Sequence, residues 1–164
     1  MGCLGVHFAL NETDLSRLLA AATDEERKQF VQEEIEQRWD KEHLYESDKA
    51  WDAIHRCLTD GTLRWGNGTY PLNLCILGEK SLYSKDDYII TLVRPAQVPD
   101  VALALQQVDQ HFIRERYYRI DPADYGLPLS EEDLEYTWAY LEWLKDFFAK
   151  AAEEGRAVVF TADQ

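Results

Sequence analysis

The chain has 164 residues, of which 46% are apolar and 12% aromatic, and its formal net charge is −14. This length and composition predict one domain, residues 1–164, with a substantial hydrophobic core. The acidic balance argues against nucleic acid as a partner, because phosphate binding needs clustered Lys and Arg. No apolar run is long enough to span a membrane.

The negative charge is concentrated in two segments. Residues 24–48 hold ten acidic and four basic side chains, and residues 121–155 hold ten acidic and two basic ones. These segments form either a solubilising surface or a surface for a basic protein partner. The three cysteines form no close pair and no signal peptide precedes them, so we expect free thiols and a cytoplasmic protein.

The first third of the chain predicts one strand and two helices. Residues 4–11 alternate as a strand does, and residues 12–22 and 24–39 follow as helices. The strand would direct Val6, Phe8 and Leu10 to one side. The second helix would carry an imperfect apolar stripe of Phe30, Ile35 and Trp39.

The middle of the chain predicts a short helix and a buried strand. Ser47 is placed to cap a helix over residues 48–59. Asn67-Gly68 is typical of a tight turn, and the apolar run 72–78 fits a helix or a strand equally well. Residues 88–93 read as a buried strand.

The last third is dominated by helices. Residues 99–116 predict one amphipathic helix, and residues 120–129 a loop. Ser130, with Asp133 in the capping-box position, begins a long helix that Gly155 ends, and residues 156–161 form a last strand. We therefore predict an α+β domain, mostly helical around a small mixed or antiparallel sheet, with a long C-terminal helix and a final short strand.

The sequence lacks the motifs that bind nucleotides or metals. There is no phosphate-binding loop, no C-x-x-C and no H-E-x-x-H, and the four histidines fall in four separate segments. We expect no cofactor and no metal. No pair of carboxylates stands out as a catalytic acid and base.

Four segments resemble the YfbM-like family of small bacterial proteins. "MGCLGVHFALNETDLSRLL" is similar to that family's opening, "DKAWDAIHRCLTDG" to its W-x-x-(aliphatic)-H-x-x-L-T-x-G segment, "PLNLCILG" to its P-L segment, and "FFAKAAEEGRAVVF" to its close. The family is a domain of unknown function, so the resemblance implies an α+β fold and no activity. Where relatives carry Tyr-Pro before the last helix, this chain reads "DYGLPLSEEDLEY", so the loop at 121–129 is expected to differ.

His55 has two interpretations. It lies in the motif formed by Trp51, His55, Leu58 and Gly61, on the apolar face of its helix. As a structural residue it would hydrogen-bond a group across the core. As a catalytic base it would line a pocket with Trp51 and residues 71–78, with Cys75 nearby. Because no second catalytic group is identifiable, the structural interpretation is favoured.

The long C-terminal helix carries an aromatic stripe beside its core face. Tyr136, Tyr140, Trp143 and Phe147 recur at helical spacing, with acidic residues, Glu142 among them, on the adjoining flank. The stripe is either core or an exposed partner site of the Tyr and Trp character found at interfaces. We predict a non-catalytic interaction or regulatory module, either a homodimer or a complex with a basic protein. The alternative is a small-molecule enzyme or ligand-binding domain with a pocket near His55.

Overall fold

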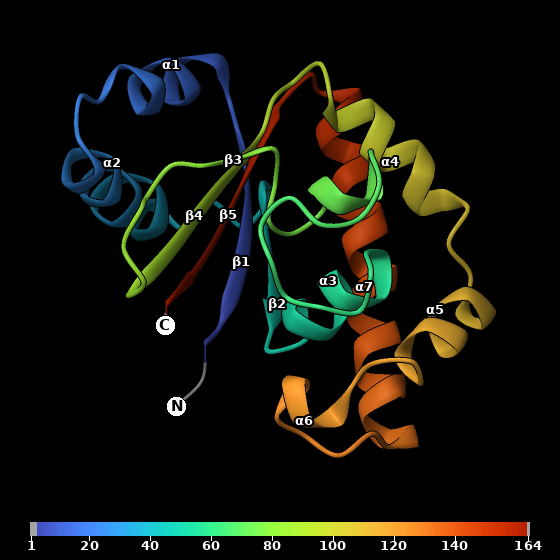
Figure 1. Ribbon diagram of the computed structural model, residues 1–164. Helices are drawn as coiled ribbons and strands as arrows, with labels where there is room; N and C mark the ends of the chain where they lie inside the picture. The colour runs from blue at the N-terminus through green and yellow to red at the C-terminus, as the bar shows by residue number, and fades with distance from the viewer. Residues whose placement is uncertain (1–2, 164) are drawn as a thin grey trace.

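Five antiparallel strands form one sheet in the computed structural model, which describes residues 3–163 (Figure 1). Met1, Gly2 and Gln164 lie outside the described residues. The strand order across the sheet is β2-β1-β5-β4-β3. Their bounds are β1 Gly5–Leu10, β2 Leu44–Asp48, β3 Lys80–Ser81, β4 Tyr88–Val93 and β5 Ala157–Asp163.

Helices cover both faces of this sheet (Figure 1). On one side lie α1 (Glu12–Ala20), α2 (Asp24–Phe30) and a π-helix (Val31–Glu36). On the other side lie α3 (Trp51–Leu58), a 3-10 helix (Leu72–Leu74), α4 (Val98–Gln106), α5 (Gln110–Tyr117), α6 (Pro122–Tyr125) and α7 (Glu131–Glu153). No helix in residues 3–163 combines the length and the apolarity that crossing a membrane requires.

The central strand β5 shows why both layers are stable. Ala157 and Val159 face the α1–α2 side, whereas Val158, Phe160 and Ala162 face the α3–α7 side. Because both faces are buried, the strand reads as an unbroken apolar run rather than an alternating one. The predicted α+β class, the long C-terminal helix and the final strand are confirmed, and the sheet is antiparallel throughout.

The predicted helix over 99–116 is wrong, because it is two helices. Val108 closes the end of α4 through its N–H to Leu105 O, and Asp109 then caps α5 by accepting from Phe112 N. An aspartate at an N-cap stabilises a new helix start by satisfying an otherwise unpaired N–H. The apolar spacing continues across the break and therefore hides it.

The predicted helix over 24–39 changes its winding at Val31. From that residue to Glu36 the chain is a π-helix, in which each turn holds an extra residue. Val31 and Ile35 are therefore the buried positions, and Phe30 and Trp39 are only partly buried. The altered period explains why the apolar stripe looked imperfect in the sequence.

Ser47 does not cap a helix, because it lies in β2, a strand that the sequence analysis did not predict. Its Oγ donates to Gly5 O across the sheet, and α3 begins four residues later, after Ala50. A Cβ at Gly5 would lie 2.6 Å from Trp51 and 2.8 Å from Phe160, so only glycine fits where β1, β2 and α3 meet. The turn expected at Asn67-Gly68 joins no strands, since residues 62–71 form an irregular loop.

Candidate functional site

The aromatic stripe of α7 divides into an inner and an outer part. Phe147 turns inward, with its ring 5.9 Å from the imidazole of His7 and 6.2 Å from the ring of Tyr45. Trp143 points outward and is 64% exposed. Tyr136, Tyr140 and Phe147 are all partly buried and pack against the core. The stripe is therefore neither wholly core nor wholly surface.

The two tyrosines are fixed by contacts with β2. Tyr136 Oη donates to Asp48 Oδ2 at 2.8 Å and accepts from Lys49 N at 3.1 Å. Tyr45 Oη donates to the backbone carbonyl of Tyr140. The rings of Tyr136 and Tyr140 meet edge to face at 4.9 Å, and those of Tyr140 and Trp143 at 6.1 Å. Tyr136 is thus held by hydrogen bonds, and Tyr140 and Trp143 follow it as a continuous row of ring contacts.

Carboxylates surround these aromatic rings. Burial raises the pKa of Tyr136 to about 12, and its hydrogen bond to Asp48 acts in the same direction. Burial also raises the pKa of Tyr140, and the charges of Asp48 and Glu46 add to it. We call the set Tyr136, Tyr140 and Trp143, with the carboxylates of Glu46, Asp48 and the exposed Glu142, the acidic aromatic patch.

His55 lies inside the fold, where it holds a loop. It is 2% exposed, and its Nε2 is 2.8 Å from Asn67 Oδ1. The Asn67 amide nitrogen donates to Asp60 Oδ1 at 2.6 Å and to Thr62 O at 2.9 Å, so its oxygen faces His55 and Nε2 carries the shared hydrogen. Burial lowers the pKa of His55, against the effect of the Asn67 bond. These contacts support the structural interpretation.

The other residues of the motif surround the same helix. Trp51 is buried and donates from Nε1 to Cys3 O at 2.7 Å, while its ring lies 5.5 Å from that of Phe160. Leu58 is buried at the end of α3, and Gly61 adopts a φ of +93° that favours glycine. The motif therefore closes the carboxyl end of α3 and links it to the sheet.

The comparisons with known proteins agree with this architecture. A family model described as a domain of unknown function, DUF1877, matches residues 1–161. The chain belongs to the DUF1877 family. A crystal structure of a protein of unknown function, YfbM from Escherichia coli, is similar to this chain with a TM-score of 0.66 and 21% identity, over 97% of this chain and 99% of that one. Among curated proteins, none matches the sequence.

The resemblance to the YfbM-like family is thereby confirmed. At 21% identity the likeness to the YfbM structure shows the fold alone. The function of this DUF1877 chain must therefore be argued from its own side chains.

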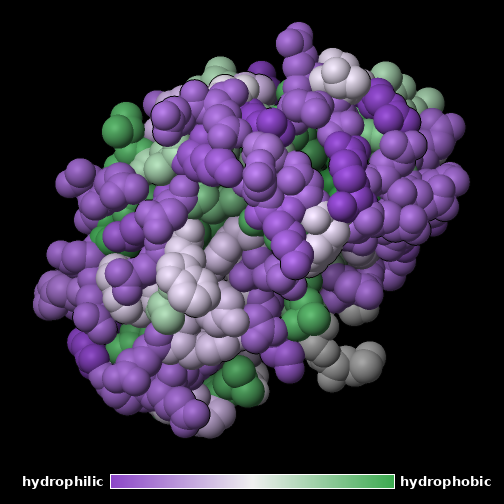
Figure 2. Space-filling model, turned by 180° about the vertical axis from the view of Figure 1, so that it is seen from behind, coloured by the Kyte–Doolittle hydropathy of each residue, from purple (hydrophilic) through white to green (hydrophobic). Residues whose placement is uncertain are grey.

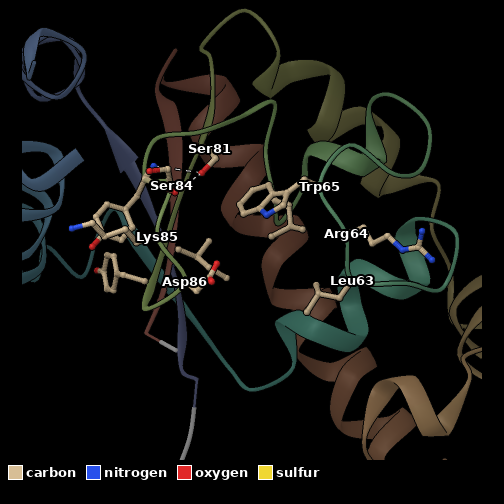
Figure 3. Close-up of a pocket in the computed structure, with 11 residues that line it drawn as sticks. Leu63, Arg64, Trp65, Ser81, Ser84, Lys85 and Asp86 are labelled. Carbon is tan, nitrogen blue, oxygen red and sulfur yellow. Dashed lines mark hydrogen bonds between the residues drawn. The ribbon is translucent and has the colours of Figure 1, made fainter. Parts of the chain in front are cut away.

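The pocket in Figure 3 has a volume of about 420 Å³ and lies between the 63–65 loop and the β3–β4 connection. Two of its polar side chains already have partners within the protein. Ser81 Oγ donates to Tyr83 O at 2.8 Å, and Lys85 pairs with Glu25. The Arg64 side chain extends away from the other labelled residues (Figure 3). His55 does not line this pocket.

The cysteines and carboxylates of residues 3–163 form no evident metal site. No group of three His, Cys, Asp or Glu side chains in this range is arranged to hold a metal ion. Cys75 accepts at its backbone oxygen from His7 Nε2 at 2.9 Å. Burial raises the pKa of the Cys57 thiol to about 12 and also raises that of Cys75, so both are protonated at neutral pH.

Two polar residues of the interior contacts, His7 and Asn67, were missed in the sequence. His7 is fully buried among Tyr45, Phe147, Phe148 and Phe160, and its alternation in β1 gave no sign of that cage. Asn67 is the hydrogen-bond partner of His55, and its Asn-Gly pair was interpreted as a hairpin turn instead.

Proposed function

We propose that this protein is an interaction module that binds a basic protein partner through the acidic aromatic patch. The observation that carries the proposal is the exposure of Trp143, at 64%, on a rigid aromatic platform. Tyrosine and tryptophan dominate binding energy at protein interfaces. Aromatic anchors that are already ordered lose little conformational entropy when a partner docks.

The charges around the patch favour a basic partner. Glu46 and Asp48 from β2 lie close enough to Tyr140 to affect its pKa, and the exposed Glu142 precedes Trp143 on α7. The whole chain carries −14. An Arg or Lys of a partner would contact both the ring faces and these carboxylates. Seen from behind, the surface is mostly hydrophilic, with a pale region of intermediate hydropathy and small apolar groups (Figure 2).

The same charges disfavour a symmetric homodimer through this patch. In such a dimer the patch faces its own copy, so like charges would meet. The homodimer is therefore kept as an outcome of the test and not as the proposal.

The test starts from proteins captured from the native host and continues with the purified captured protein. We expect it to be basic and Trp143→Ala to weaken its binding by about 2 kcal/mol, chiefly through faster dissociation in surface plasmon resonance. Trp65→Ala is the matched control, because Trp65 is another exposed tryptophan, at 53%, outside the patch. Equal binding by the Trp143 variant and wild type contradicts the proposal.

Association kinetics test the acidic part of the patch separately. Glu142→Gln should slow association, and the effect should fade as salt shortens the Debye length below about 8 Å. Glu33→Gln, which removes an exposed carboxylate from the other acidic segment, should leave the rate unchanged. If sedimentation equilibrium gives the mass of two chains for wild type and of one chain for Trp143→Ala, the patch is a homodimer interface and not a site for a basic partner.

A further inference from the structure

Two neighbouring pockets open beside the carboxyl end of α3. The larger, of about 500 Å³, lies between that end, the 68–72 loop and α4, and the smaller, of about 200 Å³, lies beside Arg56 and Arg119. Both are lined by Thr59, Asp60 and Arg116, so they meet along this shared wall. We call the pair the double pocket.

Three arginines line the smaller pocket, although the protein as a whole is acidic. Seven of the ten arginines form ion pairs within residues 3–163: Arg17, Arg27, Arg38, Arg56, Arg94, Arg114 and Arg156. In the same part of the chain, Arg116 and Arg119 form no ion pair with a carboxylate. Unpaired guanidinium groups that line a concave surface are suited to binding carboxylate or phosphate, through two parallel hydrogen bonds.

Arg116 is held in place while donors on its guanidinium stay free. Its Nη1 donates to the backbone oxygens of Cys57 at 3.3 Å and Thr59 at 3.0 Å, and its guanidinium lies 4.3 Å from the centre of the Phe112 ring. Within residues 3–163, its Nε and Nη2 donate to no protein acceptor. The group is therefore oriented before any ligand arrives.

The third arginine of the smaller pocket, Arg56, stabilises the wall and is not free to bind a ligand. Arg56 is 5% exposed and donates to Asp52 at 2.6 Å and to Asp124 at 2.6 Å. These carboxylates neutralise Arg56, and within residues 3–163 Arg116 and Arg119 are the arginines of the pocket that form no ion pair.

One oxygen of Asp60, the carboxylate in the shared wall, accepts internal hydrogen bonds. Asp60 Oδ1 accepts from Asn67 Nδ2 at 2.6 Å and from the Thr62 hydroxyl at 2.6 Å. His55 holds Asn67 in turn, so the motif histidine is a positioning residue for this wall. Gly68 packs against it as well, because a Cβ there would lie 2.7 Å from Thr59 Cγ2.

The larger pocket has an apolar part, which determines what kind of ligand can fill it. Its apolar lining comes from Leu58, Pro71, Leu72, Ala104 and the ring of Tyr70. Its volume lies in the range of pockets that hold small organic molecules. An anionic group at Arg116 would thus be attached to an apolar body beside Leu58 and Ala104.

We propose that the double pocket binds a small organic anion, whose carboxylate or phosphate monoester group contacts Arg116 and Arg119 and whose apolar body fills the larger pocket. This site shares no residue with the acidic aromatic patch, so the two proposals can fail independently.

The test is calorimetric titration of the full chain with octanoate and with phenyl phosphate. We expect saturable binding of at least one, and which of them binds tells carboxylate from phosphate. Octanamide, which has the same apolar body without the charge, should bind about tenfold more weakly than octanoate if the head is a carboxylate. For phenyl phosphate the uncharged counterpart is phenol, with the same expectation.

Substitutions in and beside the double pocket test where the anion binds. Arg119→Gln, which removes an exposed side chain without an ion pair, should weaken binding about tenfold. Arg114→Gln, on α5 five residues before Arg119, is the matched control, because Arg114 pairs with Glu131 and lies outside the double pocket, and it should bind as wild type does. Ala104→Phe should fill the larger pocket and abolish binding of the organic anions, and a thermal melt checks that it still folds.

Three results would overturn the proposal: no saturable binding of either anion, equal affinity of wild type and Arg119→Gln, or an uncharged counterpart that binds as tightly as its anion.

Discussion

Trp51 and Trp143 look alike in the sequence and have opposite surroundings in the structure. Each lies on a helix beside acidic residues. Trp143 has its aromatic neighbour, Tyr140, within one helical turn, whereas the aromatic neighbour of Trp51, Phe160, comes from a distant strand. Trp51 is 4% exposed, donates to Cys3 O and packs on Phe160, whereas Trp143 is 64% exposed. Within residues 3–163 its one aromatic neighbour is Tyr140, with the ring centres 6.1 Å apart. The comparison shows that covering elements, not residue type, decide whether an aromatic side chain supports the fold or remains available to a partner.

The largest expected effect is on the buried side of this comparison. Trp51→Ala should lower the free energy of unfolding by about 3–5 kcal/mol, because it leaves a cavity and an unpaired Cys3 carbonyl. Urea unfolding followed by circular dichroism measures the change. A loss below about 1 kcal/mol would mean that the α3–sheet junction does not depend on this ring.

The next largest effect is expected on the pH dependence of stability, through His7, whose buried imidazole packs against Phe147. Burial lowers the pKa of His7 from 6.5 to about 4. Below pH 6.5 the unfolded chain therefore binds a proton at His7 that the folded chain does not bind. The contribution of the neutral imidazole to the free energy of unfolding is complete above pH 6.5 and is lost as the pH falls toward 4. The loss amounts to about 3 kcal/mol.

His7→Gln should flatten the dependence of unfolding free energy on pH between 6.5 and 4. The control is His111→Gln, because the His111 side chain is 79% exposed and should leave the wild-type slope unchanged. Parallel slopes for wild type and His7→Gln would show that the imidazole is not buried in its neutral form.

His55→Ala should have an intermediate effect, lowering the free energy of unfolding by about 1–3 kcal/mol through an unpaired Asn67 oxygen and lost packing. Thermal unfolding measures it. A melt indistinguishable from wild type would weaken the structural interpretation and restore the case for a catalytic base.

The smallest effect is expected on the exposed side. Trp143→Ala should change the free energy of unfolding by less than about 0.5 kcal/mol, because little of the ring is buried. Urea unfolding beside Trp51→Ala measures both in one experiment. A loss approaching that of Trp51→Ala would make Trp143 part of the core and remove the main support for the acidic aromatic patch.

Strongly periodic segments could be predicted from sequence, and weakly periodic ones could not. The strands near 4–11, 88–93 and 156–161 and the helix from Ser130 to Gly155 are present within a few residues of their expected bounds. The strand β2 was missed because Leu44–Asp48 is a short edge strand with one neighbour and partly exposed side chains. Its stability comes from pairing with β1, which no local pattern contains.

The candidate sites divide in the same way. Helical spacing was enough to place Tyr136, Tyr140 and Trp143 on one stripe of α7. It could not supply Glu46 and Asp48, which reach the stripe from β2, about ninety residues earlier. It also could not show that Phe147 turns into the core.

By itself the sequence determined the acidic charge, the α+β class, the long last helix and the motif around His55, because composition and periodicity are local properties that each segment carries alone. Tertiary structure decided the rest. It gave His55 its partner Asn67, brought Arg116 to the end of α3, and covered Trp51 while leaving Trp143 exposed. Those outcomes depend on contacts between segments far apart in the chain, whose packing against one another fixes burial and pairing together.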